Sequence, residues 1–232
     1  MLPAVNTSAP AKRRLPVGWQ TLIAMAAVLL VDLTIGDTFI QELPSEAADE
    51  DLLTIQISFA IEGVVLGLAV LCWLLGWLRW LRRIAFGFAG LVTLGLLLSV
   101  TGLLFSLETE TNAYELLWDA GLLWANNVLI FSIWYWLVDG GGLEARQATA
   151  GRGDFAFPQQ TIELASWKDW RPSYFDYLFL AFSHSTAFSP ADTVVLSKRA
   201  KGLIMVQASV SLVILAMIAA RAINIIQAGP AS

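Results

Sequence analysis

The sequence predicts an all-α integral membrane protein: a polytopic bundle of five transmembrane helices with one short re-entrant or interfacial, pore-like helix. Of the 232 residues, 57% are hydrophobic and 14% are charged. Soluble domains average about 45–50% apolar and about 25% charged residues. The mean hydropathy is +0.66, and several apolar runs reach the length of about 20 residues that a membrane-crossing helix needs. This composition excludes a disordered chain and argues against a soluble enzyme, and Cys72, the only cysteine, excludes a disulfide scaffold.

Apolar runs divide the first part of the chain. Residues 1–16 are polar and contain proline, so we expect a disordered cytoplasmic arm. Residues 17–138 are expected to form a four-helix transmembrane region. Its predicted spans are 17–40, 52–78, 84–107 and 113–138.

The second part begins where Gly140, Gly141 and Gly142 interrupt the helix pattern. Residues 139–172 are mixed in character and are predicted to form a cytoplasmic connection. Residues 173–232 are predicted to hold the pore-like helix and the last span, at 202–227. The pore-like helix corresponds to the apolar run 174–188, which is too short to cross a bilayer comfortably.

Basic residues predict the orientation. All but one of the 14 Lys and Arg residues fall into four clusters, at 12–14, 79–83, 146–171 and 198–201. The acidic connections at 41–51 and 108–112 contain none. Because cytoplasmic loops are enriched in Lys and Arg, we expect a cytoplasmic N-terminus, acidic loops outside and a C-terminus outside. The predicted location is the inner (plasma) membrane of a bacterium.

The same charge pattern predicts how the run 174–188 meets the membrane. If this segment crossed, the basic cluster at 198–201 would lie outside, against every other cluster. If it dips in and returns, both flanks stay cytoplasmic. We therefore expect a re-entrant or interfacial segment. Irregular backbone at membrane depth is tolerated only against protein or a water-filled cavity, so a dip implies packing on the other helices or a pore.

Polar residues inside the predicted spans form a candidate buried network. A charge at bilayer depth costs about 2.5–3.5 kcal/mol on insertion scales, so each needs a reason. We expect Arg221 to pair with Asp119, or else with Asp32. The network is interpreted either as structural contacts between helices or as a permeation or proton path. Its members are Asp32, Glu62, Asp119, Asn126, Gln207, Arg221 and Asn224.

Hydroxyl groups and one acid after the short apolar run form the candidate pore loop. We expect the hydroxyls to line a mouth and Asp192 to attract cations. His184 is the only histidine and is interpreted as a packed residue or as a proton sensor. The candidates are Ser183, His184, Ser185, Thr186, Ser189 and Asp192.

No motif predicts catalysis, a metal site or a cofactor. One histidine without nearby cysteines or paired carboxylates is not a metal site, and neither G-x-S-x-G nor H-E-x-x-H is present. Gly151-Arg152-Gly153-Asp154 matches the letters G-x-G-D of intramembrane aspartyl proteases but lies in a polar segment. Because no catalytic motif is complete, we do not expect an enzyme. Because the pI is acidic, we do not expect a nucleic-acid binder.

The C-terminal third, roughly 142–226, resembles an uncharacterised family of bacterial multi-pass membrane proteins that is defined by sequence and has no assigned activity. The residues that carry the resemblance are Gly141-Gly142-Leu143, Asp154-Phe155 ahead of Pro158, the segment 176–183, the segment 186–192, and Arg199-Ala200-Lys201.

The segment order also resembles the pore half of tetrameric cation channels: helix, short pore helix, filter-like turn, helix. Thr186-Ala187-Phe188-Ser189-Pro190 stands where a potassium filter has T-V-G-Y-G. It contains no glycine to adopt the strained filter backbone, so no potassium filter is expected.

Two functions follow as hypotheses. The chain is an ion-channel-like or transporter-like protein, or it is a non-catalytic structural or accessory subunit of a membrane complex. The expected partners are the lipid bilayer and either further copies of the chain or another subunit of such a complex.

Overall fold

The structure, a computed structural model, describes residues 18–42, 48–106, 113–140, 153–162, 170–186 and 192–228. At 37–42, 48–51, 105–106, 113–116 and 221–228 it describes the backbone only.

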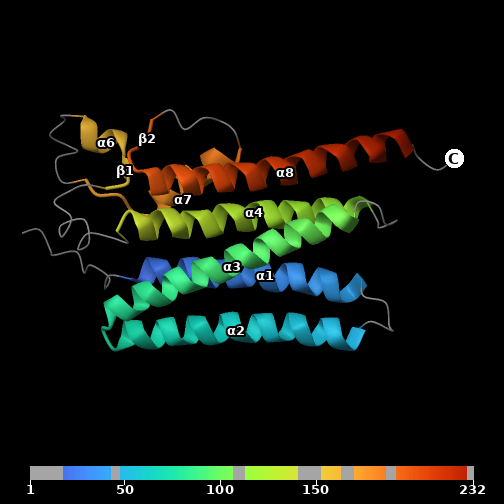
Figure 1. The fold of residues 1–232 in the computed structure, drawn as a ribbon, viewed down its shortest axis with the longest axis horizontal. Helices are drawn as coiled ribbons and strands as arrows, with labels where there is room; N and C mark the ends of the chain where they lie inside the picture. The colour runs from blue at the N-terminus through green and yellow to red at the C-terminus, as the bar shows by residue number, and fades with distance from the viewer. Residues whose placement is uncertain are drawn as a thin grey trace, which may run out of the picture.

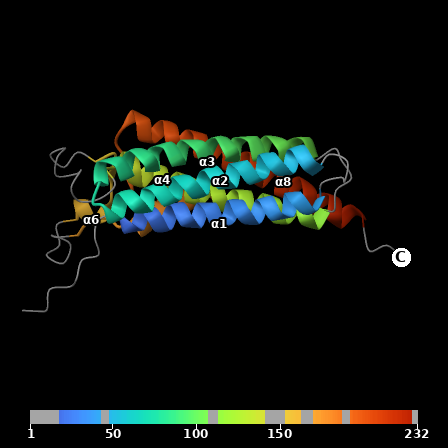
Figure 2. The same ribbon diagram turned by 90° about the horizontal axis from the view of Figure 1, so that it is seen from below.

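Five long helices dominate the described chain and run side by side along the long axis of the molecule (Figure 1, Figure 2). Each contains a run that is long and apolar enough to cross a membrane. The prediction of an all-α, multi-pass membrane protein is confirmed. The helices are α1 (Trp19–Glu42), α2 (Ala48–Leu74), α3 (Leu78–Ser106), α4 (Ala113–Val138) and α8 (Lys198–Ala228).

The described part of the chain also holds four short elements at or near one end of the bundle. They are β1 (Phe155–Ala156), α6 (Pro158–Thr161), α7 (Tyr174–Ser185) and β2 (Val194–Val195). The two strands pair antiparallel, with Phe155 opposite Val195 and Ala156 opposite Val194. The sequence does not predict this strand pair, because so short a ladder carries no periodic signal.

Helix α4 is the centre of the bundle. It packs against α1, α3, α7 and α8, and 67% of the residues in its span are buried within the protein, against at most 33% in any other span. Its buried apolar side chains include Ile130, Phe131 and Ile133. Helix α2 is the least buried of the five, so its apolar side chains, such as Leu68 and Leu71, face outward.

The turn between α2 and α3 shows why the predicted boundaries differ. Gly76 has a positive φ of 72°, and the amide of Trp77 donates to the carbonyl of Cys72 at 2.8 Å. This is the closure that ends a helix at a left-handed glycine. The helix therefore stops at Leu74, and Leu78, predicted as the end of the second span, begins α3.

Helix α7 belongs to a hairpin that dips into the bundle and returns. It begins beside the end of α4, where the Tyr177 hydroxyl donates to Asp139. It ends near the middle of α4, where Trp124 Nε1 donates to the carbonyl of Ser185 at 3.4 Å. Strand β2 then lies back at the starting end, since the Leu196 amide donates to the carbonyl of Asp154 at 2.9 Å. The geometry is that of the expected re-entrant segment, although the helix ends at Ser185 rather than at 188.

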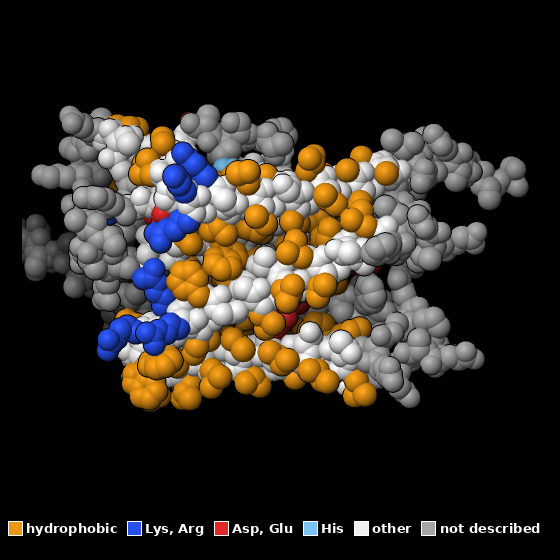
Figure 3. Space-filling model, viewed as in Figure 1, with side chains coloured by type: hydrophobic (Ala, Val, Ile, Leu, Met, Phe, Trp, Pro, Cys, Tyr) orange, Lys and Arg blue, Asp and Glu red, His pale blue; other side chains and the backbone are white. Residues whose placement is uncertain are grey.

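The two ends of the bundle differ in charge. Figure 3 shows Lys and Arg side chains gathered at one end, with hydrophobic side chains covering the length beyond it. We call this the basic end; it carries Arg79, Arg82, Arg83, Lys198, Arg199 and Lys201. The opposite end, where α1 leads to α2 and α3 leads to α4, is called the acidic end after the acids at 41–51 and 108–112.

Candidate functional site

Polar side chains from four helices lie at the same depth in the bundle. Asp32 is near the middle of α1 and Glu62 is near the middle of α2. Asn126 and Ser211 occupy the corresponding positions of α4 and α8. At 1.5 Å per residue, each lies about 18–20 Å from the basic end of its helix. We call these residues, with Asn127 beside them, the mid-depth belt.

Two carboxyl groups of the belt face each other between α1 and α2. The side chains of Asp32 and Glu62 are close enough to share a hydrogen bond, and Asn126 Nδ2 donates to Asp32 Oδ1 at 2.6 Å. Glu62 is 8% exposed and its Oε2 has no hydrogen-bond partner among the described residues. The sequence predicts both acids within spans; the structure adds that they meet.

A groove leads from these acids toward the acidic end. It encloses a cavity of about 450 Å³ between α1, α2 and α3. Small residues of α3 leave the space: Gly95, Ser99 and Gly102 lie on one helix face, and a Cβ built on either glycine would meet no atom within 4 Å. Figure 3 shows acidic atoms in a furrow of the surface about halfway along the molecule. The remaining lining residues are Ile35, Gly36, Thr54, Ile55, Ser58, Phe59, Val92 and Leu98.

The other side of α4 connects the belt to the re-entrant helix. Asn127 Nδ2 donates to Ser211 Oγ at 2.7 Å and to the carbonyl of Gln207 at 3.4 Å. The Gln207 side chain is fully buried. It donates to the carbonyl of Ala181 at 2.9 Å and to Ser185 Oγ at 2.7 Å, and it accepts from the Tyr135 hydroxyl. Gln207 of α8 thus binds α7 through Nε2 and α4 through Oε1.

The candidate pore-loop hydroxyls are engaged within this packing. Ser183 Oγ donates to the carbonyl of Phe179 at 2.8 Å, and Thr186 Oγ1 lies 3.2 Å from the carbonyl of Phe182. Ser185 is held by Gln207. Asp192 is exposed, and Ser189 lies outside the described residues. A mouth lined by these groups stays a prediction.

His184 is half-buried on α7 beside the ring of Tyr135, with ring centroids 6.1 Å apart. Its Nδ1 lies 2.7 Å from the carbonyl of Leu180 in the same helix. Because a carbonyl oxygen only accepts, the ring nitrogen that hydrogen-bonds to it must carry a hydrogen. The two residues are one helical turn apart. The local bond and the ring contact fit the interpretation of His184 as a packed residue.

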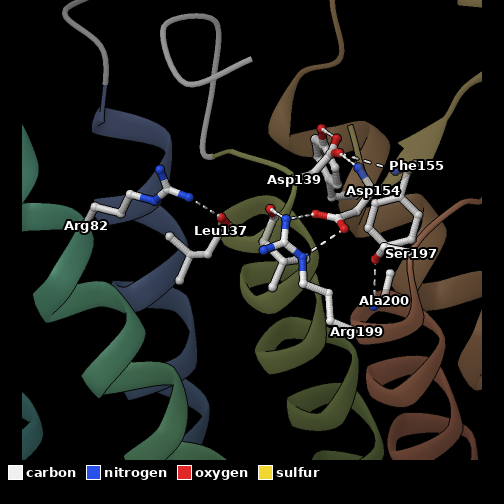
Figure 4. Close-up of polar contacts among 10 residues, drawn as sticks. Arg82, Leu137, Asp139, Asp154, Phe155, Ser197, Arg199 and Ala200 are labelled. Atoms are coloured by element: carbon white, nitrogen blue, oxygen red, sulfur yellow. Dashed lines mark hydrogen bonds and ion pairs between the residues drawn. The ribbon is translucent and has the colours of Figure 1, made fainter. Parts of the chain in front are cut away.

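A second polar cluster closes the basic end (Figure 4). Asp139 follows α4 and accepts hydrogen bonds from the amides of Asp154 and Phe155, at 2.5 and 3.3 Å, and from the Tyr177 hydroxyl. Asp154 is paired by Arg199 through two contacts, at 2.8 and 2.5 Å. The Asp154 side chain is 5% exposed and that of Arg199 is 66% exposed. This basic-end cluster joins α4, β1, α7 and α8.

Two arginines also bind the last carbonyl groups of α4. Arg82 Nη2 donates to the carbonyl of Leu137, and Arg199 Nη2 donates to that of Val138, both at 3.1 Å. Cations at the carboxyl end of a helix stabilise carbonyl groups that have no partner within it. The chemistry of the basic-end cluster is therefore structural, since both of its acids have donors.

The structure brings part of the predicted network together. Asp32, Glu62 and Asn126 meet at the belt, and Gln207 joins Asn127 on the other side of α4. Asp119 is buried on α4 at 7% exposure. The side chains of Arg221 and Asn224 lie outside the described residues, so the pairing of Arg221 stays a prediction.

Sequence reasoning misses the basic-end cluster. In the sequence, Asp139 is the end of a span, Asp154 belongs to a motif in the wrong context and Arg199 is one of several loop charges. One feature of the sequence could have indicated it: Asp139 directly precedes three glycines. At such a turn, an aspartate side chain can accept hydrogen bonds from backbone amides of the returning chain. No protein-family model, curated protein sequence or solved structure matches the chain.

Proposed function

We propose that this chain is a channel-like or transporter-like membrane protein that moves a small cation through its helix bundle. The observation that carries the proposal is the row of polar groups that begins in the groove. On one side of α4, Asp32 and Glu62 lie with Asn126. On the other side, the adjacent Asn127 contacts Gln207, which binds the re-entrant helix. Intramembrane acids that face a bundle interior typically belong to ion or proton pathways.

The two halves of this row have different access. The groove extends from the belt toward the acidic end and is lined by small residues of α3, which supports a route along this half of the bundle. Beyond the belt, the polar groups are buried and hydrogen-bonded, so passage requires them to exchange partners. We expect this combination, a groove on one side of the belt and a hydrogen-bonded region on the other, in a gated or alternating path.

Flux measurements in liposomes test the proposal. Purified protein should release entrapped K⁺, Na⁺ or H⁺ faster than protein-free liposomes. The Gly102→Leu variant places a side chain in the groove, where a Cβ at this position meets no atom within 4 Å, so we expect its flux to fall to the protein-free level. Its matched control is Gly90→Leu, which lies on the exposed surface of the same helix and also meets no atom. Absence of flux for every cation in the unmodified protein would contradict the proposal.

The candidate pore loop is tested in the same liposomes. If Asp192 attracts cations at a mouth, Asp192→Asn should lower the flux of cations and leave its rank order unchanged. Thr186→Ala should change the flux only if the Thr186 hydroxyl leaves its contact with Phe182 to line the path. Flux like that of the unmodified protein in both variants would place the path elsewhere.

A structural or accessory subunit is the second candidate, and the outer face of α7 favours it. Phe175, Phe179 and Phe182 lie on one helix face and are 71, 61 and 46% exposed. In a re-entrant helix this apolar face contacts lipid or another protein. Co-purification of a fixed partner that is lost in the Phe179→Ala variant, together with absent flux, would support this candidate.

The orientation is tested by cysteine labelling of intact cells. In a Cys72→Ser background, we expect a membrane-impermeant maleimide to label the Glu46→Cys and Ser232→Cys variants from outside. The Lys201→Cys variant should be labelled only after the cells are opened, because Lys and Arg are retained on the cytoplasmic side. The reverse pattern would invert the proposed orientation, and a protected Ser232→Cys would contradict a C-terminus outside.

A further inference from the structure

The side chains of Asp32 and Glu62 would repel each other if both were ionised, and no described neighbour carries a positive charge that offsets this repulsion. Two carboxylates in contact cannot both be ionised without strong repulsion, and one proton held between them removes it. A hydrogen bond between two carboxyl groups itself requires a proton on one of them. Asn126 Nδ2, which donates to Asp32 Oδ1, is a neutral amide and brings no positive charge to the pair.

Neighbouring elements supply no compensating charge among the described side chains. Helix α3 lines the groove with apolar and hydroxyl residues, none of which titrates: Val92, Gly95, Leu98, Ser99 and Gly102. Helix α4 supplies Asn126 and, about 10 Å further toward the acidic end, the acid Asp119. Helix α8 packs on α4, and its Arg221 side chain is outside the described residues, as are the side chains of 37–42 and 48–51 on α1 and α2.

Two buried acceptors at this position have no donor. Glu62 Oε2 and Asn126 Oδ1 are both buried and without a hydrogen-bond partner in the described structure, as is Oδ1 of Asn127 on the other side of α4. Buried acceptors of this kind are rare in folded proteins and call for a proton, a water or an ion. Glu62 lies at the inner end of a groove whose lining residues extend toward the acidic end, and Asn126 contacts Asp32 beside it.

We propose that Asp32 and Glu62 hold one proton between them. Through the groove, they exchange protons with the side of the membrane that the acidic end of the bundle faces. A proton that arrives from hydronium in the groove binds the carboxylate that is still ionised, and the pair becomes neutral. Its release to water restores one negative charge, so no other reactant is needed. The inference rests on the proposed function, because it names the proton as the cation that the path carries.

The oxygen count favours a proton over a divalent metal cation. Ca²⁺ takes six to eight oxygen ligands, and Mg²⁺ requires an octahedral set. Asp32, Glu62 and Asn126 together supply two carboxyl groups and one amide oxygen. In the part of the chain that the structure describes, no group of three or more His, Cys, Asp or Glu residues could hold a metal ion.

Infrared difference spectroscopy on the full chain in liposomes tests the pair directly. We expect a carbonyl band of a protonated carboxyl group that shifts in D₂O and responds to the pH on the groove side. Glu62→Gln and Asp32→Asn should each abolish this response. Asp176→Asn, an acid at the start of α7 that lies away from the groove, should leave the band in place. Absence of the band in the unmodified protein, or its persistence in both belt variants, would overturn the proposal.

A chemical probe covers the case in which a variant fails to fold. A hydrophobic carbodiimide reacts with protonated carboxyl groups, so peptide mapping of the unmodified protein should find the modification at Asp32 or Glu62. No modification at either acid would count against the pair. Flux assays separate the two proposals: metal-cation flux without the band or the modification retains the proposed function and rejects the pair. The band and the modification without any flux retain the pair and reject the proposed function.

Discussion

Replacing Asp139 by alanine is expected to lower the free energy of unfolding by about 3–5 kcal/mol, since each buried donor left without an acceptor costs about 1–3 kcal/mol. Asp139 is 3% exposed and accepts from two backbone amides and the Tyr177 hydroxyl. Alanine removes the acceptor of all three hydrogen bonds at the position where β1, α4 and α7 meet. Equilibrium unfolding in mixed detergent micelles measures the loss.

Two further variants make this prediction specific. Asp139→Asn keeps one acceptor oxygen and should lose less stability than Asp139→Ala. Asp192→Ala removes an exposed acid from the same hairpin and should change the free energy of unfolding by less than about 0.5 kcal/mol, as is usual for surface substitutions. Equal stability of Asp139→Ala and Asp192→Ala would show that the basic-end cluster does not hold the hairpin in place.

Replacing Gln207 by leucine is expected to release α7 from the bundle and to destabilise the protein by about 2–4 kcal/mol, because buried hydrogen-bonding groups lose their partners. Leucine fits a helix and has a similar size, so the change removes mainly the hydrogen bonds to Tyr135, Ala181 and Ser185. Hydrogen–deuterium exchange should rise in α7 and stay unchanged in α2. Met205→Leu, on the exposed face of α8, is the control.

A double variant isolates the contact between Gln207 and Tyr135. Replacing both partners of a buried hydrogen bond by apolar groups can be nearly neutral, whereas replacing one leaves the other unpaired. We therefore expect Gln207→Leu combined with Tyr135→Phe to be more stable than Gln207→Leu alone. If the double variant loses as much free energy of unfolding as the two single variants together, the hydrogen bond contributes no coupling energy.

The sequence is most informative where one physical signal dominates. The apolar run at 113–138 coincides with α4, because an acidic turn precedes it and glycines follow it. The charge clusters predict the return of the segment after Tyr174, and the hairpin has that geometry. The predicted boundary between α2 and α3 is less accurate, because aromatic and basic residues continue through the turn and only Gly76 marks its position.

Partners across the bundle cannot be predicted from the sequence. Asp32 is one of the two acids expected near Arg221, and its described contacts join it to Asn126 and Glu62. Spacing along one helix gives depth and face, but it does not say which helix packs on that face. The basic-end cluster escapes prediction for the same reason: Asp139, Asp154 and Arg199 are separated by connections whose path the sequence does not determine.

The central position of α4 has a consequence for how the protein is made. Its span is the least apolar of the five, and Asn126, Asn127 and Ser132 are buried only because other helices cover them. The hydrogen bonds donated by Asn127 go to α8, which follows the other four long helices in the order of synthesis. Until α8 arrives, a nascent chain must keep this amide in contact with lipid, with the insertion machinery or with a chaperone. Completion of the bundle by α8 is therefore expected to be the step at which the inserted chain becomes stable.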